Sequence, residues 1–273
     1  MTDFSGYSAV LLDLDGTIFH DEHPLPGAKK LLEHLTERQI KFACLSNHGA
    51  SPVQITERLA TMKLPVDPDH IYTAGAAAAD YVLNRFAKAS NESDDAPRRP
   101  RIFNCSTPGV QDMLDGLVDW VETGGEPCDA VICGAPTAGF SGEARLRIAL
   151  QLLRNGANLV GICADRVYPS TRGIEFGAGA ASWFLGYAAN ARPVFCGKPE
   201  AIFFQELCAR LQVEPAQCLM IGDNLESDVA GAANVGMKTI LTLTGVTRRR
   251  DLLNLPVEKK PGKVIEDLTE LIS

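Results

Sequence analysis

The sequence has no excess of positive charge, no CxxC cysteine pair and no apolar run as long as a membrane span. Its net charge is −8, and its Lys and Arg residues are scattered apart from Arg248-Arg249-Arg250, which we interpret as a solvated surface. The negative net charge argues against nucleic-acid binding, and the absence of an apolar run as long as a membrane span argues against a membrane protein. The eight cysteines lie mostly within apolar runs, which predicts buried free thiols.

The N-terminal residues also lack the basic region and apolar stretch of a signal peptide, so we expect a cytoplasmic location. With 273 residues, of which 45% are hydrophobic and 22% charged, the chain is long enough for two ordinary globular domains. An acidic protein that binds an anion must create positive potential locally, from a metal ion, a lysine or helix N-termini.

Both ends of the chain alternate between strand and helix patterns. Apolar runs at 8–12 and 40–45 predict buried strands, and the helix between them has Ala28, Leu31, Leu32 and Leu35 on one face. A second helix is predicted with Ser51 as its N-cap, Pro52 at its first position and Gln54 completing a capping box. Near the C-terminus the alternation continues, with strands predicted at 194–196, 218–221 and 239–243 and helices between them at 200–211 and 228–234. This order predicts an α/β fold with a doubly wound, Rossmann-like parallel sheet.

The middle of the chain carries strand and helix signals of its own. They are an Ala-rich helix after Gly75, apolar runs near Ile102, Val131 and Val160, and a helix over 141–155 closed by Gly156. We therefore expect a discontinuous core domain, 1–76 and 191–273, interrupted by an inserted α/β domain, 77–190. Within the insert, residues 89–100 are polar and charged, which predicts a surface loop.

Two carboxylates, Asp13 and Asp15, follow the first predicted strand. In an extended segment their side chains point to the same side, so they can converge on one metal ion and one phosphorus atom. Phosphoryl transfer needs a nucleophile, neutralisation of charge and a proton for the leaving oxygen, tasks that this pair could divide. Asp-Gly is also a common turn dipeptide, so the pair alone leaves a simple turn open.

Further polar groups follow other predicted strands. Lys198 could bind a phosphate and hold Asp13 ionised, although an isolated lysine there is more often a solvated loop residue. Asp223 adds a carboxylate at the sheet edge where doubly wound folds bind ligands, and Asp228 either joins it or caps the next helix. Mg²⁺ favours oxygen ligands of this kind.

Ser46 and Asn47 stand before the second predicted helix. Their hydroxyl and amide groups, with free backbone N–H groups at a helix start, can hold phosphate oxygens. An ordinary loop is the alternative.

In this order, the stretches resemble the haloacid dehalogenase (HAD) superfamily: Asp13-x-Asp15-Gly16-Thr17, Ser46-Asn47, Lys198, and Gly222-Asp223-Asn224 up to Asp228. The resemblance covers nearly the whole chain. Residues 24–27, 177–179 and 197–199 look like the NagD-like and para-nitrophenyl phosphatase branch, subfamily IIA, which carries a large α/β cap. The resemblance therefore implies that 77–190 form such a cap on a HAD core.

It also implies a Mg²⁺-dependent phosphatase that hydrolyses a small phosphate monoester through an aspartyl-phosphate intermediate. A sugar phosphate, a nucleoside monophosphate or phosphoglycolate would be a suitable phosphorylated metabolite. Asp13 would be the nucleophile and a metal ligand, and Asp15 the general acid and base with its carbonyl on the metal. The other implied site residues are Asp223 on the metal, Asn224 and Asp228 in support, and Ser46, Asn47, His48 and Lys198 on the phosphate.

Two positions depart from the family pattern. His48 stands where many relatives have Asn or a small residue, and it either contacts substrate or fills space. Tyr168 falls near the cap histidine of several eukaryotic relatives, and it is a candidate substrate contact or a core residue.

Alternative functions also stay open. Asp15 favours phosphate esters, because dehalogenases of the superfamily lack the second carboxylate. A phosphotransferase or phosphomutase would use the same aspartates, and a catalytically silent binding or regulatory module could keep the same fold. The oligomeric state is open as well, with a homodimer through the cap as one arrangement.

Overall fold

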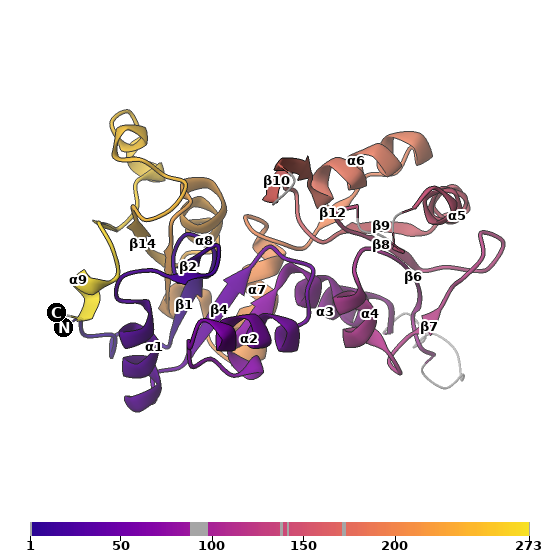
Figure 1. The fold of residues 1–273 in the computed structure, drawn as a ribbon. Helices are drawn as coiled ribbons and strands as arrows, with labels where there is room; N and C mark the ends of the chain where they lie inside the picture. Colours follow the sequence, from indigo (N-terminus) through magenta and orange to yellow (C-terminus); the bar gives the residue numbers. More distant parts are fainter. Residues whose placement is uncertain (1, 88–97, 137–138, 141, 171–172, 273) are drawn as a thin grey trace. The chain divides into compact units, whose positions relative to one another are not determined.

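The computed structural model describes residues 2–87, 98–136, 139–140, 142–170 and 173–272, which form two compact units (Figure 1). The first unit comprises Met1–Ser46, Pro52–Tyr72 and Lys198–Ser273, and the second comprises Asn47–Ser51 and Thr73–Gly197. The sequence analysis expects the domain limits between residues 76 and 77 and between residues 190 and 191, several residues away from the limits of these units. The expected domain limits stay a prediction. The loop predicted at 89–100 falls largely outside the described residues.

The first unit is built on a six-stranded sheet in the order β15-β14-β13-β1-β4-β5. Its strands are β1 (Ala9–Asp13), β4 (Phe42–Ser46), β5 (Ile71–Thr73), β13 (Cys218–Gly222), β14 (Lys238–Thr242) and β15 (Lys263–Ile265). Strand β1 pairs in parallel with β4 on one side and β13 on the other. These three strands are buried along their whole length, which is why they are continuous apolar runs in the sequence.

The order of strands reverses at β1. Strands β4 and β5 follow on one side of it, whereas β13, β14 and β15 extend to the other. The carboxyl ends of β1 and β13 therefore meet at a topological switch point, the place where open α/β sheets bind ligands.

Helices and short hairpin strands complete the first unit. They are β2 (Phe19–His20), β3 (His23–Pro24), α1 (Ala28–Glu37), α2 (Pro52–Thr61), η1 (Pro68–His70), α7 (Ala201–Leu211), η3 (Pro215–Gln217), η4 (Leu225–Ala230), α8 (Gly231–Ala233), η5 (Arg249–Leu252), η6 (Val257–Lys259) and α9 (Thr269–Ile272). Helix α1 buries the four apolar residues expected from its spacing. The helix expected over 228–234 differs, because it begins earlier as the π-helical turn η4, and α8 continues it for three residues.

The second unit has a five-stranded parallel sheet in the order β12-β9-β8-β6-β7. Its strands are β6 (Arg101–Cys105), β7 (Asp119–Trp120), β8 (Ala130–Cys133), β9 (Asn158–Gly161) and β12 (Val194–Phe195), with a separate hairpin of β10 (Val167–Ser170) and β11 (Gly173–Phe176). Its helices are α3 (Ala74–Phe86), α4 (Pro108–Leu114), α5 (Glu143–Arg154) and α6 (Ala178–Ala189). Helices α5 and α6 pack on the sheet through a core that includes Phe103, Leu152, Leu159 and Leu185.

One strand lies in a different sheet from the one expected. The sequence groups residues 194–196 with the C-terminal strands of the core, but β12 pairs with β9 at the edge of the second sheet. A two-residue apolar strand carries no pattern that identifies its neighbour, so the sequence could not assign it. The fold class is nevertheless the one predicted: parallel sheets flanked by helices, with a second α/β unit inserted into the first.

Two expectations from composition can also be compared with the structure. Seven of the eight cysteines are buried, all eight are free, and Cys128 is half-buried. No helix within the described residues is both long and apolar enough to cross a membrane.

The burial of β13 leads to a stability prediction. Leu219→Ala should lower the free energy of unfolding by about 2–5 kcal/mol, because Leu219 is 1% exposed and its loss leaves a cavity. Leu253→Ala removes the same atoms from a side chain that is 78% exposed, and should change it by less than about 0.5 kcal/mol. Urea denaturation followed by circular dichroism measures both, and equal losses would contradict the assigned core.

Candidate active site

The carboxyl edge of the first sheet brings together acidic groups that are far apart in the sequence. Asp13 is the last residue of β1, and Asp223 follows the last residue of β13. Strands β1 and β13 are neighbours in register, with Leu12 opposite Ile221. Parallel pairing therefore places both carboxylates at the switch point, as the sequence predicts.

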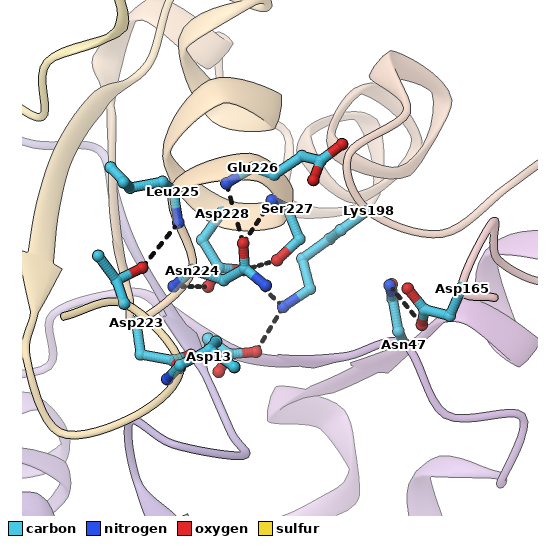
Figure 2. Close-up of polar contacts among 12 residues, drawn as sticks. Asp13, Asn47, Asp165, Lys198, Asp223, Asn224, Leu225, Glu226, Ser227 and Asp228 are labelled. Atoms are coloured by element: carbon cyan, nitrogen blue, oxygen red, sulfur yellow. Dashed lines mark hydrogen bonds and ion pairs between the residues drawn. The ribbon is translucent and has the colours of Figure 1, made fainter. Parts of the chain in front are cut away.

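Lys198 is the cation of this cluster. Its Nζ donates hydrogen bonds to Oδ1 of Asp13 and, at 2.8 Å, to Oδ1 of Asp228 (Figure 2). The three residues are 3%, 6% and 1% exposed for Lys198, Asp13 and Asp228 respectively. Burial by itself lowers the pKa of the Lys198 ammonium, but the two carboxylates outweigh it and raise the pKa above its ordinary value. Lys198 therefore stays protonated.

A single ammonium does not balance the acidic groups around it. Oxygens of Asp13, Asp223 and Asp228 all lie within 4.8 Å of one another. Burial raises the pKa of the Asp13 carboxyl well above its usual value; Lys198 opposes this shift, and Asp228 and Asp223 add to it. Burial, and then the charge of Asp228, likewise raises the pKa of Asp223. Such a buried cluster of hard oxygen donors fits a divalent cation such as Mg²⁺.

Close approach to these carboxylates requires glycine. Gly16 has φ +86°, and a Cβ on it would lie 2.7 Å from a carboxylate oxygen of Asp223. A Cβ on Gly222 would lie still closer to a carboxylate oxygen of Asp228, and a Cβ on Gly245 still closer to one of Asp223. Replacing any of these glycines would therefore displace a buried acidic group.

A loop after β14 completes the support of the site, and sequence reasoning missed it. The backbone N–H of Val246 donates to Oδ2 of Asp223 at 2.5 Å, and Oγ1 of Thr244 donates to the carbonyl of Gly16 at 2.6 Å. The one feature of the sequence that could have indicated this loop is its position, because it also follows a buried strand at the carboxyl edge. Backbone donors leave no residue signature that would identify it.

The sequence left open whether Asp228 joins the acidic cluster or caps the next helix. In the structure Asp228 joins the cluster, and Asn224 is the cap. Asn224 caps η4, since its Oδ1 accepts from the N–H groups of Glu226 at 2.9 Å and Ser227 at 3.2 Å. Asp228 lies within this turn, where its Oδ2 accepts from the N–H of Asn224 at 3.0 Å and its Oδ1 faces Lys198 (Figure 2). The cap thus orients the turn that carries Asp228 to the ammonium.

The remaining predicted residues of the first unit are Asp15 and Ser46. Asp15 is an exposed residue beside the buried Asp13. Ser46 is buried at the end of β4, one residue beyond Leu45, which pairs with Asp13. Both thus lie at the same edge of the sheet as Asp13.

Three other predicted residues belong to the second unit. Asn47 donates from Nδ2 to the carboxylate of Asp165 at 3.1 Å (Figure 2), and Nδ1 of His48 accepts from the N–H of Ala50 at 3.0 Å. Tyr168 is half-buried on β10, opposite Glu175. Their contacts with phosphate or substrate stay predictions.

Comparison with known proteins shows to which family the chain is similar. Residues 10–117 match a family model described as haloacid dehalogenase-like hydrolase, and residues 195–271 match a second one described as HAD-hydrolase-like. An acid sugar phosphatase of Staphylococcus aureus is 30% identical over 270 residues, which are 98% of this chain and 97% of the relative. The 5'-nucleotidase YutF of Bacillus subtilis is 27% identical over 267 residues, 97% of this chain and 98% of the relative.

A solved structure shows the same likeness. The 4-nitrophenylphosphatase of Thermotoga maritima superposes with a TM-score of 0.84 at 28% identity, over 98% of this chain and 97% of that one. The motif matches, the relatives and the fold all agree with the resemblance read from the sequence. The chain belongs to the haloacid dehalogenase-like hydrolases, in the branch of the para-nitrophenyl phosphatases, and is a phosphoric monoester hydrolase.

Proposed function

We propose that this enzyme hydrolyses small phosphate monoesters by way of a phosphorylated Asp13, and that it uses Mg²⁺. The observation that carries the proposal is the buried Asp13 carboxylate, paired with Lys198 and lying beside Asp223 at the switch point. Asp13, Asp223 and the carbonyl of Asp15 would hold the metal, with Asp228 and Asn224 in support. When bound, the metal would neutralise charge on the phosphate oxygens.

In the first half-reaction, a carboxylate oxygen of Asp13 attacks phosphorus and the bond to the leaving oxygen breaks. Lys198 neutralises negative charge on the transferring group. Asp15, an exposed residue next to the nucleophile's strand end, supplies the proton that the leaving alkoxide needs. The products are the free alcohol and an aspartyl phosphate.

In the second half-reaction, Asp15 is a carboxylate and takes a proton from water. The water attacks the phosphorus of the aspartyl phosphate, and free phosphate leaves as Asp13 is regenerated. Ser46, Asn47 and the backbone at His48 are proposed to hold the non-reacting oxygens. Tyr168 is the proposed contact to the leaving group.

The relatives support a small phosphorylated substrate, since their names describe a 5'-nucleotidase, an acid sugar phosphatase and a 4-nitrophenylphosphatase. Sugar phosphates, nucleoside monophosphates and phosphoglycolate are therefore the first substrates to test. A phosphotransferase or phosphomutase would use the same two aspartates, but it would need a second hydroxyl substrate to accept the phosphoryl group. The cytoplasm remains the proposed location.

Asp13→Asn should lower kcat at least about 10³-fold, because an amide cannot act as the nucleophile. The measurement is release of free phosphate from this substrate panel with Mg²⁺ and no added acceptor. Asp67→Asn makes the same change at an exposed position without a side-chain cap bond, and should leave the rate unchanged. Hydrolysis by Asp13→Asn at the wild-type rate would refute the mechanism, and phosphate release only with an added acceptor would favour the phosphotransferase.

Asp15→Asn should separate the two half-reactions. With 4-nitrophenyl phosphate, whose leaving group departs as an anion, the variant should release about one nitrophenolate per enzyme and then stop. The burst arises because Asp13 still attacks but no base activates water. Stopped-flow absorbance measures it, and steady turnover at the wild-type rate would exclude Asp15 as the base.

Metal binding should be visible without turnover. Saturating Mg²⁺ should raise the thermal midpoint, corresponding to about 2.7 kcal/mol at a concentration 100 times Kd, because it neutralises the buried carboxylates of the native state only. Asp223→Asn should lose most of this shift, whereas Asp67→Asn should keep it. Differential scanning fluorimetry with and without Mg²⁺ makes the comparison. An equal shift in all three proteins would place the ion elsewhere.

A further inference from the structure

Two cysteines that the proposed mechanism does not use face each other in the first unit. Cys208 lies in the last turn of α7, and Cys218 is the first residue of β13. Their Sγ atoms are 3.9 Å apart and share a hydrogen bond, and the two residues are 2% and 0% exposed. The sulfurs of a disulfide are about 2.05 Å apart, so a movement of about 2 Å would join them.

A short surface connection joins the two cysteines. They are ten residues apart in the chain, and α7 ends between them at Gln212, which has φ +55°. The backbone N–H of Val213 donates to the carbonyl of Cys208 at 3.0 Å, and the thiol of Cys218 donates to the carbonyl of Glu214 at 3.5 Å. Gln212 and Glu214 are exposed. The thiol of Cys218 thus bonds to a residue at the surface, and the pair lies directly beneath the connection.

A lysine stands beside the pair of thiols. Nζ of Lys41 donates to the carbonyl of Leu211 at 2.7 Å, three residues after Cys208. The hydrogen bond from the Cys208 thiol lowers the pKa of Cys218; burial opposes this shift, and the charge of Lys41 adds to it. The thiolate is the nucleophilic form of cysteine, and a neighbouring cation favours it. Cys218 is therefore the sulfur better suited to attack another molecule.

Another pair of neighbouring cysteines provides a comparison. Cys105 and Cys133 lie opposite each other on β6 and β8, in the second unit. The thiol of Cys133 donates to the carbonyl of Gly134 at 3.8 Å. Burial raises the pKa of both thiols, to about 11 for Cys105 and to about 12 for Cys133. Neighbouring cysteines thus need not be reactive, and the lowered pKa of Cys218 distinguishes it from these two.

The pair of thiols lies at the opposite end of β13 from the candidate active site. Cys218 begins this strand and Asp223 follows its last residue, so roughly 16 Å of extended chain separate them. At this distance neither sulfur can touch the phosphorus atom that Asp13 would attack. The thiols are therefore not further catalytic groups, and their chemistry can be measured separately from hydrolysis.

We propose that Cys208 and Cys218 form a redox modification site, which hydrogen peroxide converts into a disulfide between α7 and β13. The Cys218 thiolate attacks one oxygen of the peroxide, the O–O bond breaks and hydroxide leaves, so that Cys218 becomes a sulfenic acid. The sulfur of Cys208 then attacks the sulfur of Cys218, the S–O bond breaks, and the second hydroxide leaves. In total the two thiols lose two electrons and two protons, and one peroxide becomes two molecules of water.

Such a disulfide is reversible. A dithiol reductant restores both thiols by exchange through a mixed disulfide, and is itself oxidised to a disulfide. Disulfides that form in proteins kept mostly reduced are usually transient and redox-sensing. The pair would thus respond to peroxide without involving a residue of the active site.

The first test locates the bond in the full-length protein. The reduced, folded chain is treated with a small excess of hydrogen peroxide, its remaining thiols are alkylated, and it is digested without reductant. Trypsin and a glutamyl endopeptidase cleave after Glu206, Arg210 and Glu226, which places the two cysteines on separate peptides, 207–210 and 211–226. Mass spectrometry should find these peptides joined, and separate after treatment with dithiothreitol. Six of the eight cysteines should be alkylated, because only two are oxidised.

Single variants separate the roles of the two sulfurs. In Cys208→Ala the sulfenic acid of Cys218 has no partner, so dimedone, which reacts with sulfenic acids, should label Cys218. In Cys218→Ala the remaining Cys208 should stay a thiol. Cys133→Ala removes a buried thiol outside the pair, and should leave the disulfide intact.

The wild-type digest decides the proposal whether or not the variants fold. Cys208 and Cys218 that stay reduced, or that are oxidised separately to sulfenic or sulfinic acids, would overturn it. So would a disulfide that joins other cysteines in their place. Labelling of Cys208 in Cys218→Ala, with none of Cys218 in Cys208→Ala, would overturn the assignment of Cys218 as the attacking sulfur.

Discussion

A buried ammonium between two buried carboxylates is the interaction on which the site depends. Lys198 bonds to Asp13 from the end of β1 and to Asp228 from the turn after β13, so one side chain joins segments that are far apart in the chain. Breaking such a buried pair by removing one partner costs about 3–5 kcal/mol, since the other charge is left without compensation. The pair therefore fixes the direction in which the Asp13 carboxylate points.

The same cluster of buried side chains contains more carboxylates than ammonium groups. Asp223 adds a third carboxylate, and glycines at 16, 222 and 245 allow the three to approach one another without a side chain between them. Burial is the main cause of the raised pKa of Asp13, and the charges of Asp228 and Asp223 add to it. A divalent cation would offset these charges and leave Asp13 ionised, the state that a nucleophile requires.

The parts of the fold that rest on buried parallel strands could be predicted from the sequence. Strands β1, β4 and β13 are apolar up to their last residues because both faces are covered, and the positions of Asp13 and Asp223 follow from the strand ends. Lys198 and Asp228 were found by their motifs, and the structure brings them together with Asp13. Strand ends and motif spacing were enough to predict that these four residues lie together.

Other features depend on tertiary contacts that leave no local signal. The Thr244 and Val246 contacts use a loop whose role is set by its position after β14. The sheet to which β12 belongs is decided by its neighbour β9 and not by its own residues.

The central claim is that Asp13 carries the phosphoryl group during turnover. The most direct measurement is mass spectrometry of the enzyme quenched in acid while it hydrolyses 4-nitrophenyl phosphate, followed by digestion and sequencing of the modified peptide. The account predicts a phosphoryl group on the side chain of Asp13, at higher occupancy in Asp15→Asn than in the wild type. A phosphoryl group on another residue, or turnover without any phosphorylated peptide in either protein, would contradict it.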